Sequence, residues 1–111
     1  MNAKFLKHAD GTCHASLDSP YAVLGSFLED ELGTSEQKLP FSFKCYIGWL
    51  EQAIVKSDPS TYGGDVHSLL YEKGSVVIDH NYDMHPPVKL ASEQLFRILK
   101  EWRDFVRSGD S

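Results

Sequence analysis

The stretch from Tyr62 to Asp83 constrains the fold of this chain more than any other. It predicts two strands, 65–72 and 75–81, because Val, Leu, Ile and Tyr suit a pleated, half-buried surface. The Lys-Gly pair 73–74 between them supplies the positive φ that a short hairpin loop needs. A two-stranded hairpin is not stable alone in water, so the rest of the chain must cover it.

Three further segments can provide that cover, since their apolar residues recur at helical spacing. These predicted amphipathic helices run over residues 19–32, 42–56 and 92–107. Ser19 followed by Pro20 indicates the capped start of the first helix, and Ser42 can cap the second.

These elements together predict an α+β fold. Its small antiparallel sheet is built on the central hairpin, about 65–81, and is covered by the three helices. The Asp-Gly pair 10–11 also predicts a turn between two strands within residues 4–17. At 111 residues the chain is long enough for one real core, and we expect a single domain, 1–111.

The net charge of −5 limits the possible partners. Nucleic acids and anionic membranes are bound by faces rich in Lys and Arg, so neither is an expected partner, whereas a basic protein fits. The sequence has no apolar run long enough to span a membrane and no signal-peptide pattern. Cys13 and Cys45 could form a disulfide, but two free thiols in a reducing cytoplasm fit a chain of this size better.

Two carboxylates and two imidazoles lie within residues 79–85, near a third imidazole on the neighbouring strand. His and Asp ligate zinc and iron, so these side chains could form the site of a small metal-dependent or hydrolytic enzyme. The candidates are His67, Asp79, Asp83 and His85. The alternative is a strand end that runs into a turn, where such residues bond their own backbone. The turn is favoured, because alternation puts Asp79 and His80 on opposite faces and the strict spacing of metal motifs is missing.

Other catalytic patterns are missing from the sequence. Cys45 falls inside the predicted helix 42–56, and Cys13 and His14 point apart on a strand. The run Tyr-Gly-Gly-Asp at 62–65 is neither a phosphate-binding loop nor a dinucleotide fingerprint. We therefore expect a protein that is not an enzyme and that holds no metal or cofactor.

The run Glu29-Asp30-Glu31 breaks a local rule. It lies in the last turn of the first predicted helix, where the dipole disfavours each exposed negative charge by about 0.3–1 kcal/mol. These carboxylates are either solvated surface or a feature that faces a cationic partner. Rules broken without visible compensation are where function tends to lie.

The second half of the chain resembles small immunity proteins of bacterial contact-dependent growth inhibition and related polymorphic toxin systems. The resemblance covers about residues 41–106 and is one of layout: a helix with a Trp-Leu pair, a hairpin, and a capped helix with spaced Leu, Trp and Phe. The residues that carry it are Phe43, Trp49, Leu50, Ala53, Tyr62-Gly63-Gly64-Asp65-Val66-His67-Ser68, Val76, Val77, Ile78, Tyr82, Asp83, Leu90, Ala91, Ser92, Phe96, Arg97, Ile98, Leu99, Trp102 and Phe105.

This resemblance implies a cytoplasmic protein without chemistry of its own, which binds one cognate toxin one-to-one and covers its active site. Many such toxins are nucleases with basic surfaces, to which an acidic protein is complementary. From charge and exposure, we expect the contacts to come from acidic side chains, with tyrosines as rigid anchors. These residues are Glu29, Asp30, Glu31, Tyr62, Asp65, Asp79, Tyr82 and Asp83.

Overall fold

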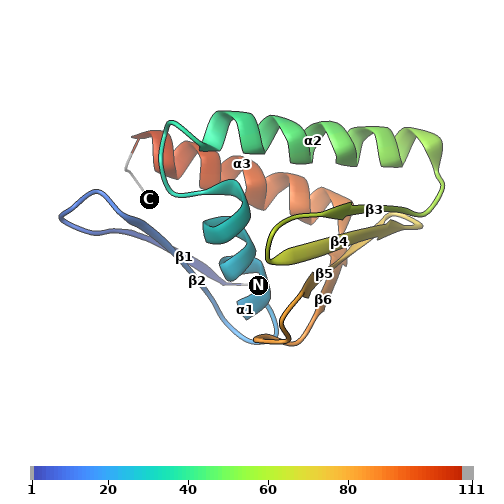
Figure 1. The fold of residues 1–111 in the computed structure, drawn as a ribbon, viewed down its shortest axis with the longest axis horizontal. Helices are drawn as coiled ribbons and strands as arrows, with labels where there is room; N and C mark the ends of the chain where they lie inside the picture. Colours follow the sequence, from blue (N-terminus) through green and yellow to red (C-terminus); the bar gives the residue numbers. More distant parts are fainter. Residues whose placement is uncertain (1, 109–111) are drawn as a thin grey trace.

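The computed structural model describes residues 2–108 and confirms the predicted α+β class (Figure 1). Strands β1 and β2 form a two-stranded antiparallel sheet, and β3-β4-β5-β6 form a four-stranded one. The short helix α1 lies between the two sheets, while α2 and α3 lie side by side along the top of Figure 1. The elements are β1 Ala3–Lys7, β2 Cys13–Leu17, α1 Ala22–Phe27, the π-helical turn η1 Leu28–Leu32, α2 Leu39–Lys56, β3 Ser60–Gly63, β4 His67–Glu72, β5 Ser75–His80, β6 Val88–Ala91 and α3 Ser92–Ser108.

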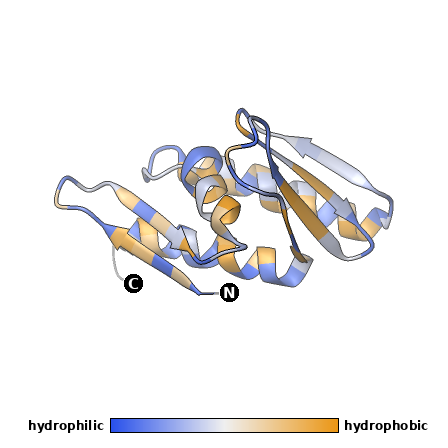
Figure 2. Ribbon diagram, turned by 90° about the horizontal axis from the view of Figure 1, so that it is seen from below, coloured by the Kyte–Doolittle hydropathy of each residue, from blue (hydrophilic) through white to orange (hydrophobic). Residues whose placement is uncertain are grey.

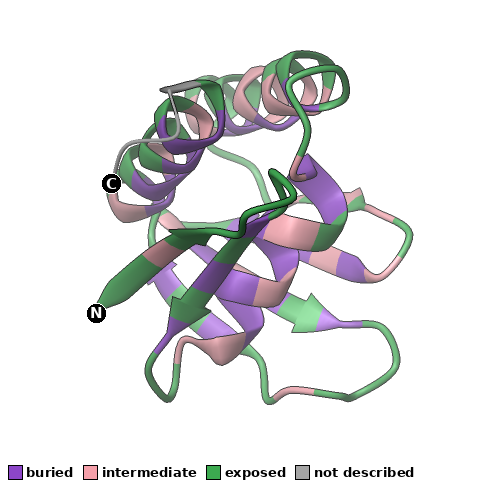
Figure 3. Cartoon of the chain, turned by 90° about the vertical axis from the view of Figure 1, so that its left-hand side faces the viewer, coloured by how far each residue is buried: buried purple, intermediate pink, exposed green. Residues whose placement is uncertain are grey.

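The predicted central hairpin is confirmed as β4 and β5. Its first strand begins at His67 rather than at residue 65, because the amides of residues 65 and 66 bond a side chain instead of a strand, and its second strand ends at His80 rather than at residue 81. Its turn residues Lys73 and Gly74 have φ values of 51° and 82°, the two positive values of the turn that matches strand twist. The first hairpin, β1 with β2, is also confirmed around the turn at residues 8–12. That turn is hydrophilic in Figure 2 and exposed in Figure 3.

Two strands that the sequence does not predict, β3 and β6, widen the central hairpin to four strands. Each is only four residues long, which is too short for alternation to be recognised, and β6 follows Pro86 and Pro87 directly. On one face of the sheet the side chains are buried, and the opposite face is half-buried or exposed. The buried face consists of His67, Leu69, Tyr71, Val76, Ile78, His80, Val88 and Leu90.

The prediction for the start of the first helix is wrong. The helix begins at Ala22, because the Tyr21 amide donates to the Asp18 carbonyl at 2.8 Å and closes a turn over Ser19 and Pro20. At the other end the chain widens into η1, where the Gly33 amide donates to the Leu28 carbonyl five residues earlier.

The second helix begins at Leu39 rather than at Ser42, which lies inside the helix. Pro40 occupies the first turn, where a proline needs no partner for its nitrogen, and the Ser35 hydroxyl bonds the Lys38 amide at 3.3 Å. The third helix starts at the predicted residue, Ser92. None of the helices between residues 2 and 108 combines the length and the apolar character that crossing a membrane requires.

One cluster of buried side chains joins the helices to both sheets. Its largest fully buried member is Trp102 of α3, whose ring meets Phe5 of β1 edge-on with 5.2 Å between centroids. The Trp102 indole N–H donates to the Gly33 carbonyl at 3.0 Å, and this bond fixes the chain between η1 and α2. Close packing also requires Gly25, because a Cβ there would lie 2.8 Å from the Ala15 carbonyl oxygen.

We expect Trp102→Phe to lower the free energy of unfolding by about 2–3 kcal/mol, because it opens a cavity and leaves the buried Gly33 carbonyl without its donor. Urea unfolding followed by circular dichroism measures this loss. The matched control is Trp49→Phe, since the Trp49 indole bonds Ser60 in a half-buried position that water can reach. Equal losses in the two variants would contradict the importance of the Gly33 bond.

Candidate functional site

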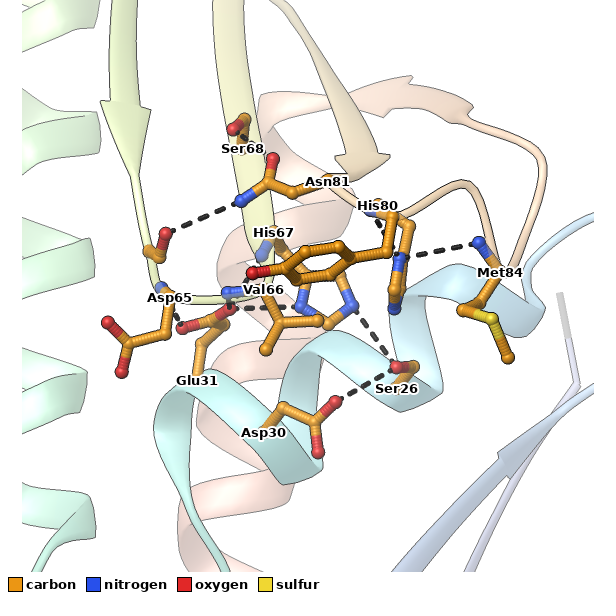
Figure 4. Close-up of polar contacts among 12 residues, drawn as sticks. Ser26, Asp30, Glu31, Asp65, Val66, His67, Ser68, His80, Asn81 and Met84 are labelled. Atoms are coloured by element: carbon orange, nitrogen blue, oxygen red, sulfur yellow. Dashed lines mark hydrogen bonds and ion pairs between the residues drawn. The ribbon is translucent and has the colours of Figure 1, made fainter.

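The structure is tied together at one end of the four-stranded sheet by the carboxylate of Glu31 (Figure 4). Glu31 is the fourth residue of η1 and only 7% exposed. Its Oε1 accepts from the Asp65 amide at 3.1 Å, and its Oε2 accepts from the Val66 amide at 2.8 Å and the His67 amide at 2.7 Å. The His67 ring nitrogen Nδ1 lies 3.0 Å from the same Oε2. One carboxylate therefore holds the whole turn between β3 and β4.

These contacts set the ionisation of the pair. Burial raises the pKa of the Glu31 carboxyl, but the hydrogen bonds from the His67 ring and from the three backbone amides outweigh it, so its pKa lies below the ordinary value. Burial lowers the pKa of the His67 imidazole, and the bond and charge of Glu31 offset only part of this effect. The native pair is therefore a charged carboxylate beside a neutral imidazole whose Nδ1 carries the proton.

Gly64 is required by close approach to this carboxylate. A Cβ on Gly64 would overlap the Glu31 carboxylate and would lie 2.8 Å from the Tyr46 hydroxyl oxygen. The Gly64 amide is itself bonded to the His67 carbonyl at 2.8 Å. Gly64, the second glycine of the pair, thus lets the backbone pass over a buried charge, whereas a Cβ on Gly63 would meet nothing within 4 Å.

A second loop, between β5 and β6, is bonded to the first. The Asn81 amide donates to the Val66 carbonyl at 2.7 Å. Behind it, Nδ1 of the buried His80 accepts from the Tyr82 amide at 3.1 Å and the Met84 amide at 3.4 Å. The loop around Asp83, whose φ is 57°, is thus held by the buried His80 ring and by the backbone of the first loop.

The two loops and the end of the first helix present a mixed surface to solvent. Tyr82 is 70% exposed and Met84 is 72% exposed, although both are large and apolar. Three exposed carboxylates lie nearby: Asp65 and Asp83 on the two loops, and Asp30 on η1. We call this set the platform: Asp30, Asp65, Tyr82, Asp83 and Met84.

The platform brings together four of the residues that the sequence analysis selected, and the structure places the others elsewhere. Glu29 points to the first hairpin, where it accepts from the Ala15 amide at 3.0 Å and pairs with the His14 ring at 2.8 Å. Tyr62 is half-buried against Tyr46, with 4.6 Å between ring centroids. Asp79 lies on the outer face of the sheet, opposite Ser68.

The expectation that Glu31 is an exposed carboxylate is wrong, because it is buried in the turn described above. A sequence signal for this exists: Glu31 lies four residues after the buried Phe27, on the apolar stripe of the helix. Met84, in contrast, was not selected, and its exposure has no sequence signal of its own.

The candidate metal ligands do not converge. His67 is enclosed and bonded through both ring nitrogens, while Asp79 is exposed on the other face of the sheet. His85 lies against His80 with 5.8 Å between centroids, as a ring contact. Among residues 2–108, no three His, Cys, Asp or Glu side chains come together in a way that could hold a metal ion.

Ser26, His67 and Glu31 follow the hydrogen-bond order of a hydrolase triad, with 3.1 Å between the Ser26 hydroxyl and His67 Nε2. The same hydroxyl lies 3.2 Å from the Asp30 carboxylate, which would repel the oxyanion that acyl transfer forms. Ser26 also lies inside α1, rather than on the sharp turn that exposes a hydrolase serine. The arrangement instead gives the buried imidazole a second partner.

Both cysteines are free thiols. Cys13 is buried in the core, where burial raises the pKa of its thiol, and Cys45 is half-buried on α2. The surroundings of Cys13 are those of a small apolar side chain rather than of a nucleophile.

Comparison with protein-family models, with characterised proteins and with solved structures found no match to this chain. The fold and the platform are therefore the basis for the functional argument.

Acidification should destabilise the protein, first through His67 and then through Glu31. As pH falls through about 6.5, the ordinary value for histidine, the unfolded chain takes up a proton that folded His67 resists, so stability declines. Glu31 adds its loss at lower pH, where the unfolded chain takes up a proton that the folded carboxylate resists because its pKa is lower. Urea unfolding between pH 7 and about 5 should show a shallower pH slope in His67→Gln than in the wild type. Equal slopes would contradict this assignment.

Proposed function

We propose that the chain is an immunity protein, without enzymatic activity, that neutralises a bacterial toxin in the cytoplasm by covering the toxin's active site. The observation that carries this proposal is the platform, where two large exposed side chains, Tyr82 and Met84, and the exposed carboxylates of Asp30, Asp65 and Asp83 lie on three segments that are bonded to one another. Protein interfaces are enriched in aromatic residues and Met and have a polar rim, and the platform contains both kinds of side chain.

Charge supports a basic partner. The chain has a net charge of −5, and the platform carboxylates belong to three separate segments that meet at one end of the sheet. A nuclease must carry a basic surface to hold its substrate, so an acidic protein competes for that surface and is steered to it from a distance. A toxin of this class is therefore the partner that we propose, bound one-to-one.

Pre-organisation supports tight binding. The platform loops are bonded to Glu31, to His80 and to one another, so little backbone freedom is left to lose when a partner binds. Tyrosine adds a large contact area with few rotatable bonds, which suits Tyr82 to the role of an anchor.

The direct test is a pull-down of the toxin domain encoded beside this chain, together with a survival assay in cells that express that toxin. We expect near-equal recovery of the two proteins, and survival only when the chain is present. Failure to bind and failure to protect would refute the proposal.

Asp65→Asn and Asp83→Asn should each slow association with the toxin domain by about two- to fivefold at low salt and should weaken the dependence of the rate on salt. Asparagine keeps the positive φ at position 83 accessible, so the loop survives. The control is Glu101→Gln on the exposed face of α3. Stopped-flow association at two salt concentrations measures the effect, and an equal effect of the control would refute a specific role for the platform.

Tyr82→Ala should raise the dissociation rate by about tenfold or more, because it removes an aromatic anchor from the centre of the interface. Val55→Ala is the matched control, since Val55 is 83% exposed on α2 and also apolar. Surface plasmon resonance measures the dissociation rate of each variant from the toxin domain. A dissociation rate that both variants leave unchanged would place the interface elsewhere.

A further inference from the structure

The platform depends on a carboxylate that does not reach the surface. Asp65, Val66 and His67 direct three successive backbone N–H groups at Glu31, within 2.7 to 3.1 Å. Successive amides that converge on one anion form a nest, an arrangement that proteins use to bind phosphate and carboxylate ligands. In this chain the anion is supplied from within, by a residue more than thirty positions earlier in the sequence.

The nest connects to the exposed residues in two ways. The Asp65 amide is one of its three donors, so Glu31 fixes the backbone from which the Asp65 side chain projects. The Val66 carbonyl, in the middle of the nest, accepts the Asn81 amide at 2.7 Å. Asn81 is followed directly by Tyr82 and Asp83, so this bond fixes the second loop relative to the nest.

The nest holds a negative group although two other carboxylates lie near it. Asp30 adjoins it on η1 and Asp65 lies on its outer side, while His67 of β4 and the Tyr46 hydroxyl of α2 close it from within. His80 of β5 lies behind His67, with 4.9 Å between ring centroids. Four donors on one carboxylate outweigh the repulsion from two exposed ones, which water screens.

We propose that Glu31 is the positioning residue of the platform: it fills the nest, fixes Asp65 and the loop that carries Tyr82, and so sets partner affinity without touching the partner. The claim on affinity rests on the proposed function, whereas the nest can be tested without any partner.

The test compares Glu31→Gln and Glu31→Ala with Asp30→Asn, which removes the neighbouring exposed charge. In both Glu31 variants we expect amide hydrogen exchange at Asp65, Val66 and His67 to accelerate by about tenfold or more, because charge-assisted bonds are lost, with little change at Ile78 in the sheet core. Dissociation from the toxin domain should accelerate by about tenfold, while the salt dependence of association stays that of the wild type. Asp30→Asn should leave exchange at residues 65–67 and the dissociation rate at their wild-type values, and should weaken the salt dependence of association.

Chemical rescue separates positioning from a general loss of stability. In Glu31→Ala the empty nest should accept acetate or formate, which would restore amide protection at 65–67 and slow dissociation again, whereas chloride at equal ionic strength should not. If Glu31→Ala does not fold, as judged by circular dichroism, Glu31→Gln keeps the side-chain volume and still tests the exchange and the dissociation rate.

Each outcome is decisive. Unchanged exchange at residues 65–67 would refute the nest, and faster exchange with a wild-type dissociation rate would refute the positioning role. A wild-type chain that binds no toxin domain would refute the proposed function and the claim on affinity, while the exchange and the acetate rescue would still report on the nest.

Discussion

A buried negative charge and the donors that surround it hold this structure together at its loop end. Removing a carboxylate from water costs several kcal/mol unless hydrogen bonds replace its hydration, and Glu31 receives four of them from a single turn. The arrangement demands a glycine at position 64 and a turn that no strand pairing could produce, and burial lowers the pKa of the His67 imidazole that bonds the carboxylate. It also joins the end of the first helix to the four-stranded sheet, two parts of the chain that are distant in sequence.

Periodicity predicted the elements that are long enough to display it. The hairpin of β4 and β5, the apolar faces of α2 and α3, and the turn at Asp10 and Gly11 all follow from local pattern. Strands β3 and β6 did not, because four residues that pair with an existing edge are defined by the sheet rather than by their own composition. The predicted starts of the first two helices were wrong because Ser19 and Ser42 have the chemistry of caps, but other residues close those turns.

The site was predictable only in part, for a similar reason. Asp65 and Asp83 were selected by charge and Tyr82 as an aromatic anchor, and the structure places all three on exposed loops, although Asp65 was predicted to begin a strand. Glu31 was grouped with its exposed neighbours by charge, although its place in the helical stripe pointed inward. Its partners could not be inferred, since the amides of Asp65, Val66 and His67 are available to any side chain that the fold brings near.

Glu29, the first residue of the acidic run, also covers a strand edge that would otherwise be open to another molecule. Strand β2 has a second edge, away from β1, whose unpaired amides could recruit a strand from another molecule. Glu29 occupies the Ala15 amide on that edge, and α1 packs so closely there that only glycine fits at position 25. The first hairpin is therefore closed to strand addition on this side, which lowers its tendency to aggregate as newly made protein accumulates.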